Sequence, residues 1–218
     1  MNILWFEQSS ANLPARDDWL SADDVARLSG MRFAKRRDDW RLGRWTAKRA
    51  VSTYLELPAD SPSLARIEIR PEPGGAPEVF IGNDPAPVRI SISHREGLAA
   101  CAVAGPHITP GCDLEIIEPR SAAFATDYFT AAEQEVAARG SAADRWRILA
   151  LLWSAKESVL KALRIGLRLD TRCVVVDALG GLAACGDEWR PLRAHCRQQV
   201  FEGCWRQTGN VVRTLVSR

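Results

Sequence analysis

One apolar segment, residues 148–163, constrains the fold more than any other part of this 218-residue chain. Its first half, residues 148–153, reads ILALLW and has the composition of a buried helix. Its second half carries Lys156, Glu157 and Lys161. Because residues four apart share a helix face, Trp153, Glu157 and Lys161 form one column. Charged groups at the end of a core helix either line a cleft or reduce stability, and which of the two holds here decides the function.

The composition is that of a soluble globular protein, with 46% hydrophobic and 26% charged residues. The length suits one large domain or two small ones. A net charge of +2 gives no basis for general nucleic-acid binding. No apolar run approaches the roughly 20 residues that span a membrane, and the first residues do not resemble a signal peptide. The six cysteines form no Cys-x-x-Cys pair, so we expect reduced, mostly packed thiols in a cytoplasmic protein.

The order of the predicted elements is helix then strands, followed by helix then strands, which indicates an α+β fold. We expect an N-terminal α+β half at residues 1–105 and a C-terminal α+β half at residues 106–218. One predicted helix begins at Ser21 as its N-cap. Further helices are predicted at about 32–56, 124–128, 130–139 and 142–163. The predicted strands lie near 3–6, 65–70, 79–81, 89–93, 98–104, 110–117, 173–176, 189–195, 200–205 and 211–215.

Asp113 and Glu115 are the first candidate site. Two residues apart on a strand, their side chains point to the same side, with roughly 6–7 Å between Cα atoms. At about 5 Å and an effective dielectric near 20, two carboxylates repel by about 3 kcal/mol. A divalent cation would remove that repulsion, and Mg²⁺ is commonly held by one or two carboxylates plus phosphate oxygens. The alternative is a solvated strand face.

Two hydroxyl residues and a histidine end an apolar strand pattern at residues 90–94. Ser91 and Ser93 share a face, and we expect His94 to begin the following turn. Such groups suit a phosphate site, but taken alone the pattern favours a polar sheet face with a histidine in a turn.

Glu133 and the basic residues of the first long helix also allow two interpretations each. Thr130 and Glu133 have the spacing of a capping box, in which the glutamate bonds back to the backbone of the cap residue. The arginines and lysines of residues 32–49 form either a solvated helix face or a phosphate site, because guanidinium groups bind phosphate oxygens in pairs.

Together these residues resemble the surfactin-type 4′-phosphopantetheinyl transferases. Three patterns occur in the order and at the spacing of that family: Ser91-x-Ser93-His94, Gly111-x-Asp113-x-Glu115 and Trp153-x-x-Lys156-Glu157-x-x-x-Lys161. Two weaker matches precede them, Gly43-Arg44 with Lys48, and Gly75-Ala76-Pro77. The resemblance implies a pseudo-dimer of two similar α+β halves, with the active site at the interface between them.

The resemblance also implies a role for each matching residue. Asp113, Glu115 and Glu157 would hold Mg²⁺, or Mn²⁺, on the pyrophosphate of coenzyme A. Lys161 would neutralise phosphate charge as the phosphoanhydride breaks, and Glu157, Lys161 and Glu133 would form the catalytic set. For Glu133, capping and deprotonation of the acceptor serine both stay open. The expected contacts to coenzyme A come from Arg37, Arg44, Arg70, Ala76, Pro77, Ser93, His94, Lys156 and Lys161.

The expected reaction transfers 4′-phosphopantetheine from coenzyme A to a serine of an apo acyl or peptidyl carrier protein, and 3′,5′-ADP leaves. We expect a monomer that serves primary or secondary metabolite assembly, with a docking surface for the acidic carrier near Phe124, Tyr128 and Phe129. The rival hypothesis is a non-catalytic module that binds a nucleotide or nucleic acid through the basic first helix.

Overall fold

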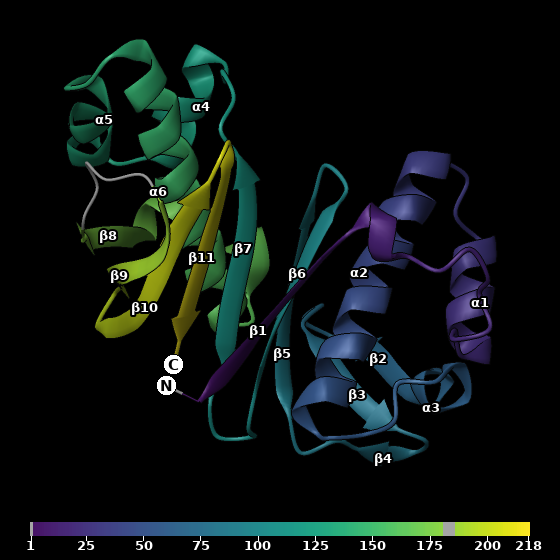
Figure 1. Cartoon of the computed structure of the whole chain (residues 1–218). Helices are drawn as coiled ribbons and strands as arrows, with labels where there is room; N and C mark the ends of the chain where they lie inside the picture. The colour runs from purple at the N-terminus through teal and green to yellow at the C-terminus, as the bar shows by residue number, and fades with distance from the viewer. Residues whose placement is uncertain (1, 181–185) are drawn as a thin grey trace. The chain divides into compact units, whose positions relative to one another are not determined.

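The computed structural model describes residues 2–180 and 186–218 and has an α+β fold, as predicted (Figure 1). The contacts divide the chain into two compact units, Met1–Pro110 and Gly111–Arg218. Each unit contains one long helix packed on a sheet. Cys185 lies outside the described residues, and the other five cysteines are free thiols. Within the described ranges, no helix is long and apolar enough to cross a membrane.

The first unit holds two three-stranded sheets, in the orders β1-β6-β5 and β2-β3-β4. Its strands are β1 (Ile3–Ser9), β2 (Ile67–Pro71), β3 (Pro77–Ile81), β4 (Asp84–Pro85), β5 (Arg89–Arg95) and β6 (Leu98–Ala104). Its helices are α1 (Ala22–Ser29), α2 (Ala34–Tyr54) and α3 (Ser61–Ala65).

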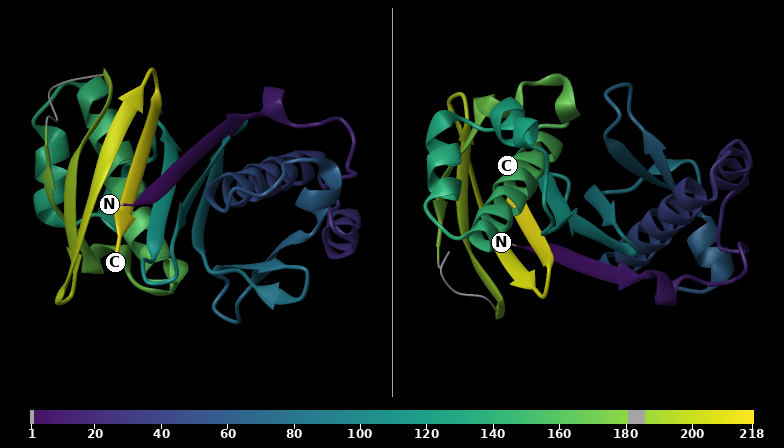
Figure 2. Two further views of the ribbon diagram at one scale, coloured as in Figure 1. Left: turned by 60° about the horizontal axis from the view of Figure 1, so that its bottom comes forward. Right: turned by 90° about the horizontal axis from the view of Figure 1, so that it is seen from above.

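Helix α2 lies along the β1-β6-β5 sheet, as Figure 2 shows. The second half of α2 supplies the buried residues Trp45 and Val51, which pack with Trp19, Ile67 and Val103 in the core of this unit. The start of the helix, from Ala34 to Asp38, is exposed. The position of α2 is therefore set by the apolar residues of its second half.

The second unit is built on a five-stranded sheet with the order β7-β11-β10-β9-β8. Its strands are β7 (Pro110–Ile116), β8 (Val174–Leu179), β9 (Gly186–Cys196), β10 (Gln199–Thr208) and β11 (Val211–Ser217). Its helices are α4 (Ala122–Tyr128), α5 (Ala131–Ala138) and α6 (Ala142–Ala162).

Helix α6 covers one face of this sheet and contacts β11, β8 and β9 (Figure 2). Leu151 and Leu160 of α6 pack with Phe201 and Trp205 in the main core of this unit. Thr214 of β11 is the centre of a buried hydroxyl group cluster. Its Oγ1 lies 2.8 Å from Oγ of Ser154 and 2.7 Å from Oγ of Ser158. Apolar contacts and these hydrogen bonds together fix the rotation of α6 on the sheet.

One sequence prediction about the first unit is wrong. His94 does not begin a turn but is part of β5, where it pairs with Ala99 of β6. The turn lies two residues further on, at Glu96 and Gly97, which have φ values of 45° and 74°. Two consecutive residues with positive φ form the tight turn that favours a β-hairpin, so the strand continues through Arg95.

Candidate active site

The candidate site lies where β7 packs directly on the second half of α6. Gly111 of β7 has no side chain, and a Cβ atom built there would lie 1.9 Å from the carbonyl oxygen of Ser158 and 2.7 Å from the backbone nitrogen of Ala162. Only glycine allows the strand and the helix to approach this closely. This contact brings the carboxylates of β7 to the charged end of α6.

Asp113 of β7 forms an ion pair with Lys161 of α6. The Nζ atom of Lys161 lies 2.7 Å from Oδ1 of Asp113 and donates a second hydrogen bond to the carbonyl oxygen of Cys112 at 3.0 Å. Burial alone would lower the pKa of Lys161, but Asp113, Cys112 and Glu157 together outweigh this effect and raise it. Lys161 is therefore a firmly protonated cation beside the strand carboxylates.

Glu115, the second carboxylate of β7, is held from two sides. The Nε1 atom of Trp153 donates a hydrogen bond to Oε1 at 3.1 Å. The Nη2 atom of Arg120, in the segment after β7, lies 2.9 Å from Oε2 and 3.2 Å from the carboxylate of Glu118. The position of Glu115 is thus fixed by a helix residue and by a loop residue.

Glu157 completes the group from α6. Burial raises the pKa of Glu157, and the charge of Asp113 adds to this, while Lys161 acts in the opposite direction. Among the residues that the structure describes, no hydrogen bond or ion pair involves the Glu157 carboxylate. A half-buried carboxylate in these surroundings would be stabilised by an added cation.

Lys156, one residue earlier on α6, points to a different part of the unit. Its side chain is fully buried, and Nζ donates hydrogen bonds to the carbonyl oxygens of Thr171 at 3.0 Å and Val174 at 2.5 Å. Its third partner is the carboxylate of Glu133, at 2.9 Å. An ammonium group has three donors, so the hydrogen-bonding capacity of Lys156 is used within the fold.

Glu133 is the N3 residue of α5, and the predicted capping box is confirmed. Its Oε2 atom accepts hydrogen bonds from the backbone nitrogen of Thr130 at 2.9 Å and from Oγ1 of Thr130 at 3.1 Å. Its Oε1 atom accepts a hydrogen bond from the backbone of Val176 at 3.4 Å. Capping, ion pairing and the contact with β8 therefore all use this one carboxylate.

Several of the predicted coenzyme A contacts lie in the first unit, around the middle of α2 and β2. Arg44 is buried, donates a hydrogen bond to the carbonyl oxygen of Ile69 at 2.6 Å, and lies 3.3 Å from Asp24. Arg70 is 41% exposed and is paired with Glu68 at 2.6 Å. Arg44 is thus part of the fold, whereas Arg70 reaches the surface.

The remaining predicted contacts of the first unit lie on α2, β5 and the turn before β3. Arg37 is exposed in the first half of α2. Ser93 is buried and His94 is exposed, and as neighbours on a strand they point to opposite faces. Ala76 and Pro77 close the β2-β3 turn, in which the backbone nitrogen of Glu72 bonds to the carbonyl oxygen of Ala76.

Asp113, Glu115, Glu157 and Lys161 are called the β7-α6 group below, and the oxygen donors of this group suit a hard divalent cation. Asp113, Glu115 and Glu157 supply carboxylate oxygens, which Mg²⁺ prefers. Over residues 2–180 and 186–218, no three His, Cys, Asp or Glu side chains are already close enough together to bind a metal ion. Lys161 and Arg120 instead provide the positive charge next to Asp113 and Glu115.

The sequence did not predict two residues that contact the carboxylates of this group. Trp153 was expected in the helix column but not as a hydrogen-bond donor to Glu115. Arg120 was not expected as a partner of Glu115, and the sequence signal for it is an arginine in the short segment Glu118-Pro119-Arg120 after the acidic strand.

A protein-family model matches the part of the chain that contains this site. The model of the 4′-phosphopantetheinyl transferase superfamily matches residues 109–207. This region is therefore similar to that superfamily. The match begins just before β7 and includes α4, α5 and α6. It therefore contains the carboxylates, the lysines and the aromatic residues described above.

The solved structures that are similar to part of the chain include two holo-acyl-carrier-protein synthases. A holo-(acyl-carrier-protein) synthase from Bacillus anthracis str. Ames, in complex with CoA (3′,5′-ADP), is 21% identical, with a TM-score of 0.39, over 46% of this chain and 91% of that chain. Helicobacter pylori holo-[acyl-carrier-protein] synthase in complex with coenzyme A is 19% identical, with a TM-score of 0.38, over 47% of this chain and 98% of that chain. A search of curated proteins found no match.

Proposed function

We propose that this protein is a Mg²⁺-dependent transferase that moves 4′-phosphopantetheine from coenzyme A to a serine of an apo acyl or peptidyl carrier protein. The observation that supports this best is the group of Asp113, Glu115, Glu157 and Lys161 on β7 and α6. It lies inside the region that matches the superfamily model. In this reaction the serine oxygen attacks the β-phosphorus, the phosphoanhydride bond breaks and 3′,5′-ADP leaves.

Asp113, Glu115 and Glu157 would hold the metal ion. A bound Mg²⁺ would neutralise the pyrophosphate and stabilise the charge that develops on the leaving phosphate. The chain's own part is to keep three carboxylates on two rigid elements. The close contact of β7 and α6 at Gly111 does this.

Lys161 would supply a fixed positive charge for the transferred phosphate group. Its raised pKa keeps it protonated, and its hydrogen bond to the Cys112 carbonyl oxygen orients it along β7. Phosphoryl transfer depends mainly on positioning and charge stabilisation, which this lysine provides without taking part in proton transfer.

Two carboxylates of this chain, Glu133 and Glu157, are candidates to accept the serine proton. The contacts of Glu133 favour its capping and ion-pairing role, because it would have to leave Lys156 or Thr130 to act as a base. Glu157 is half-buried, but the proposal places its carboxylate on the metal ion, where it cannot also accept the proton. We therefore propose that a water molecule takes the serine proton.

Coenzyme A contacts in the first unit stay part of the proposal. Arg37, Arg70 and His94 have side chains at the surface and are the better candidates for phosphate binding. The buried residues Arg44 and Lys156 would act by supporting their surroundings. The full set of proposed contacts also includes Ala76, Pro77, Ser93 and Lys161.

The carrier protein would dock near α4. Phe124 and Tyr128 pack against Trp153 with ring centroids 5.4 and 4.9 Å apart, and Tyr128 is 38% exposed. Arg120 lies over the Phe124 ring at 5.3 Å and adds a positive charge that an acidic carrier helix would contact. The expectation that Phe129 contributes to this surface is wrong, because Phe129 is 1% exposed.

The rival hypothesis, a binding module that uses the basic first helix, has less support. Arg41 is paired with Asp17 at 2.6 Å, and Lys48 is paired with Asp24 at 2.7 Å and fully buried. These basic residues therefore serve the fold of the first unit.

We also propose that the enzyme acts as a monomer in the cytoplasm and accepts Mn²⁺ in place of Mg²⁺.

The direct test is to incubate the protein with coenzyme A, Mg²⁺ and an apo carrier protein and to measure the mass of the carrier. The carrier should gain one phosphopantetheine group, and omission of the metal or of coenzyme A should prevent the gain. Absence of any mass gain with several carriers, with Mn²⁺ as well as Mg²⁺, would refute the proposal.

A further inference from the structure

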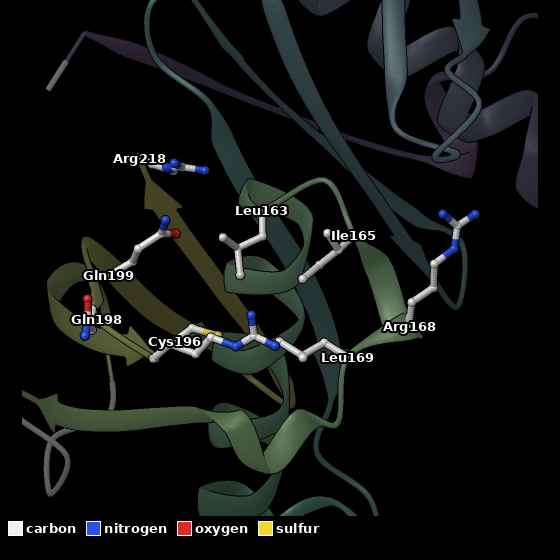
Figure 3. Close-up of a pocket in the computed structure, with 9 residues that line it drawn as sticks. Leu163, Ile165, Arg168, Leu169, Cys196, Gln198, Gln199 and Arg218 are labelled. Atoms are coloured by element: carbon white, nitrogen blue, oxygen red, sulfur yellow. The ribbon is translucent and has the colours of Figure 1, made fainter.

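The second unit also has a hollow that none of the β7-α6 carboxylates lines. It has a volume of about 760 Å³ and is formed by the end of α6, the turn that follows it and the turn between β9 and β10. Figure 3 shows the side chains that surround it. A volume of this size is typical of sites for single small molecules.

The floor of this hollow is apolar. Leu163, Ile165 and Leu169 line it together with Cys196. Burial raises the pKa of the Cys196 thiol, so this side chain is neutral and behaves as a small apolar group. The floor therefore favours a hydrocarbon chain over a polar ligand.

The charged side chains of the rim are all basic. Arg168, Arg197 and Arg218 surround the opening, and no acidic side chain lines it. In Figure 3, Arg168 and Arg218 lie on opposite sides of the hollow. All three arginines are exposed, and in the described part of the chain none of them forms an ion pair or side-chain hydrogen bond. This differs from other arginines of the unit, such as Arg193, which lies 3.5 Å from Glu202.

We propose that this hollow binds a single-chain anionic amphiphile of the fatty-carboxylate class, with its chain on the apolar floor and its head group on the arginine rim. The apolar floor alone would accept any hydrocarbon, and the three guanidinium groups select an anion. Guanidinium groups bind carboxylates through paired, charge-assisted hydrogen bonds. The proposal is independent of the transfer reaction, because none of these residues belongs to the β7-α6 group.

The ligand side can be tested on the unaltered protein. We would titrate it with decanoate below its micelle concentration and follow the methyl resonances of Leu163, Ile165 and Leu169 by NMR. Decanoate should shift these resonances in a saturable manner. Acetate, which has only the head group, and decyltrimethylammonium, which has the opposite charge, should bind at least about tenfold more weakly. Equal binding of decanoate and the cationic amphiphile, or no saturable shift, would overturn the proposal.

The protein side can be tested with charge-removing variants. Arg168→Gln, Arg197→Gln and Arg218→Gln, combined in one protein, should weaken decanoate binding by about tenfold. Arg193→Gln is the matched control, because it removes a nearby surface arginine that does not line the hollow. Decanoate affinity that is the same in the triple variant and in the control would overturn the role of the rim. Each single variant serves the same comparison if the triple variant does not fold.

Discussion

The substitution Lys156→Met tests whether the buried Glu133–Lys156 pair supports the fold or coenzyme A binding. Lys156 is fully buried, and the side chain of Glu133 is 6% exposed. Burial lowers the pKa of Lys156, while the charge of Glu133 opposes this. The pair joins α5, α6 and the chain just before and at the start of β8, through the carbonyl oxygens of Thr171 and Val174.

Removal of the ammonium group leaves the Glu133 carboxylate buried without its cation. Breaking one partner of a buried ion pair costs about 3–5 kcal/mol. In a protein of this size each kcal/mol lowers Tm by about 2–4 °C, so the expected decrease is about 6–20 °C. Methionine keeps the length and volume of the lysine chain, which limits any cavity contribution.

The assay is thermal unfolding followed by near-ultraviolet circular dichroism, with the double variant Lys156→Met/Glu133→Gln as the control. Glutamine preserves the capping box, so the double variant should be more stable than Lys156→Met alone. A Tm for Lys156→Met within about 2 °C of the wild type, together with weaker coenzyme A binding, would refute the structural role.

Three further predictions concern single contacts of the second unit. Gly111→Ala should lower stability by more than about 3 kcal/mol, because the new methyl group would meet the backbone of Ser158; a Tm close to that of the wild type would contradict this. Hydrogen bonds from Arg172 lower the pKa of Asp170 to about 2. The contact between the ionised Asp170 and Arg172 therefore stabilises the folded state above about pH 4, and this stabilisation is lost as the pH falls towards 2. NMR titration of Arg172→Ala should raise this pKa part of the way towards its usual value, because the backbone N–H of residue 172 still donates to Asp170, and an unchanged pKa would exclude the arginine side chain as a cause. Arg120→Gln should tighten Mn²⁺ binding about two- to fivefold in a spin-resonance titration, because a competing cation is removed, and weaker binding would show that the arginine helps to form the site.

Strong hydrophobic patterns made much of the second unit predictable. The long helix α6 was expected over 142–163 and covers Ala142–Ala162. The column of Trp153, Glu157 and Lys161 was expected to face the acids of β7, and the contacts of Trp153 with Glu115 and of Lys161 with Asp113 agree with this. Helical periodicity and strand alternation specify which of these side chains share a face, and the resemblance to the family implied that the two faces meet.

The role of Lys156 was not predictable from the pattern in which it occurs. It is one residue from Glu157, so it points about 100° away around the helix. Whether that direction leads to solvent or to the core depends on the segment at Thr171–Val174, which is distant in sequence. A motif fixes residue spacing along the helix but not what packs against each face.

Two smaller errors have different causes, long-range packing for Phe129 and local turn conformation for His94. Phe129 was expected at the surface, but the core formed by Ala137, Leu149 and Leu152 buries it. His94 was expected in a turn, but a turn of Glu96 and Gly97 with positive φ extends the strand beyond it.

The substitution Glu157→Gln tests the central claim most directly, because the β7-α6 carboxylates are proposed to be catalytic and not structural. The carboxylate is half-buried, and its raised pKa shows that its surroundings disfavour the charge. Neutral glutamine should therefore leave Tm unchanged or slightly higher. Transfer of phosphopantetheine to the carrier, measured by mass, should be abolished in the same preparation. Full transfer activity, or a large loss of Tm, would contradict the account.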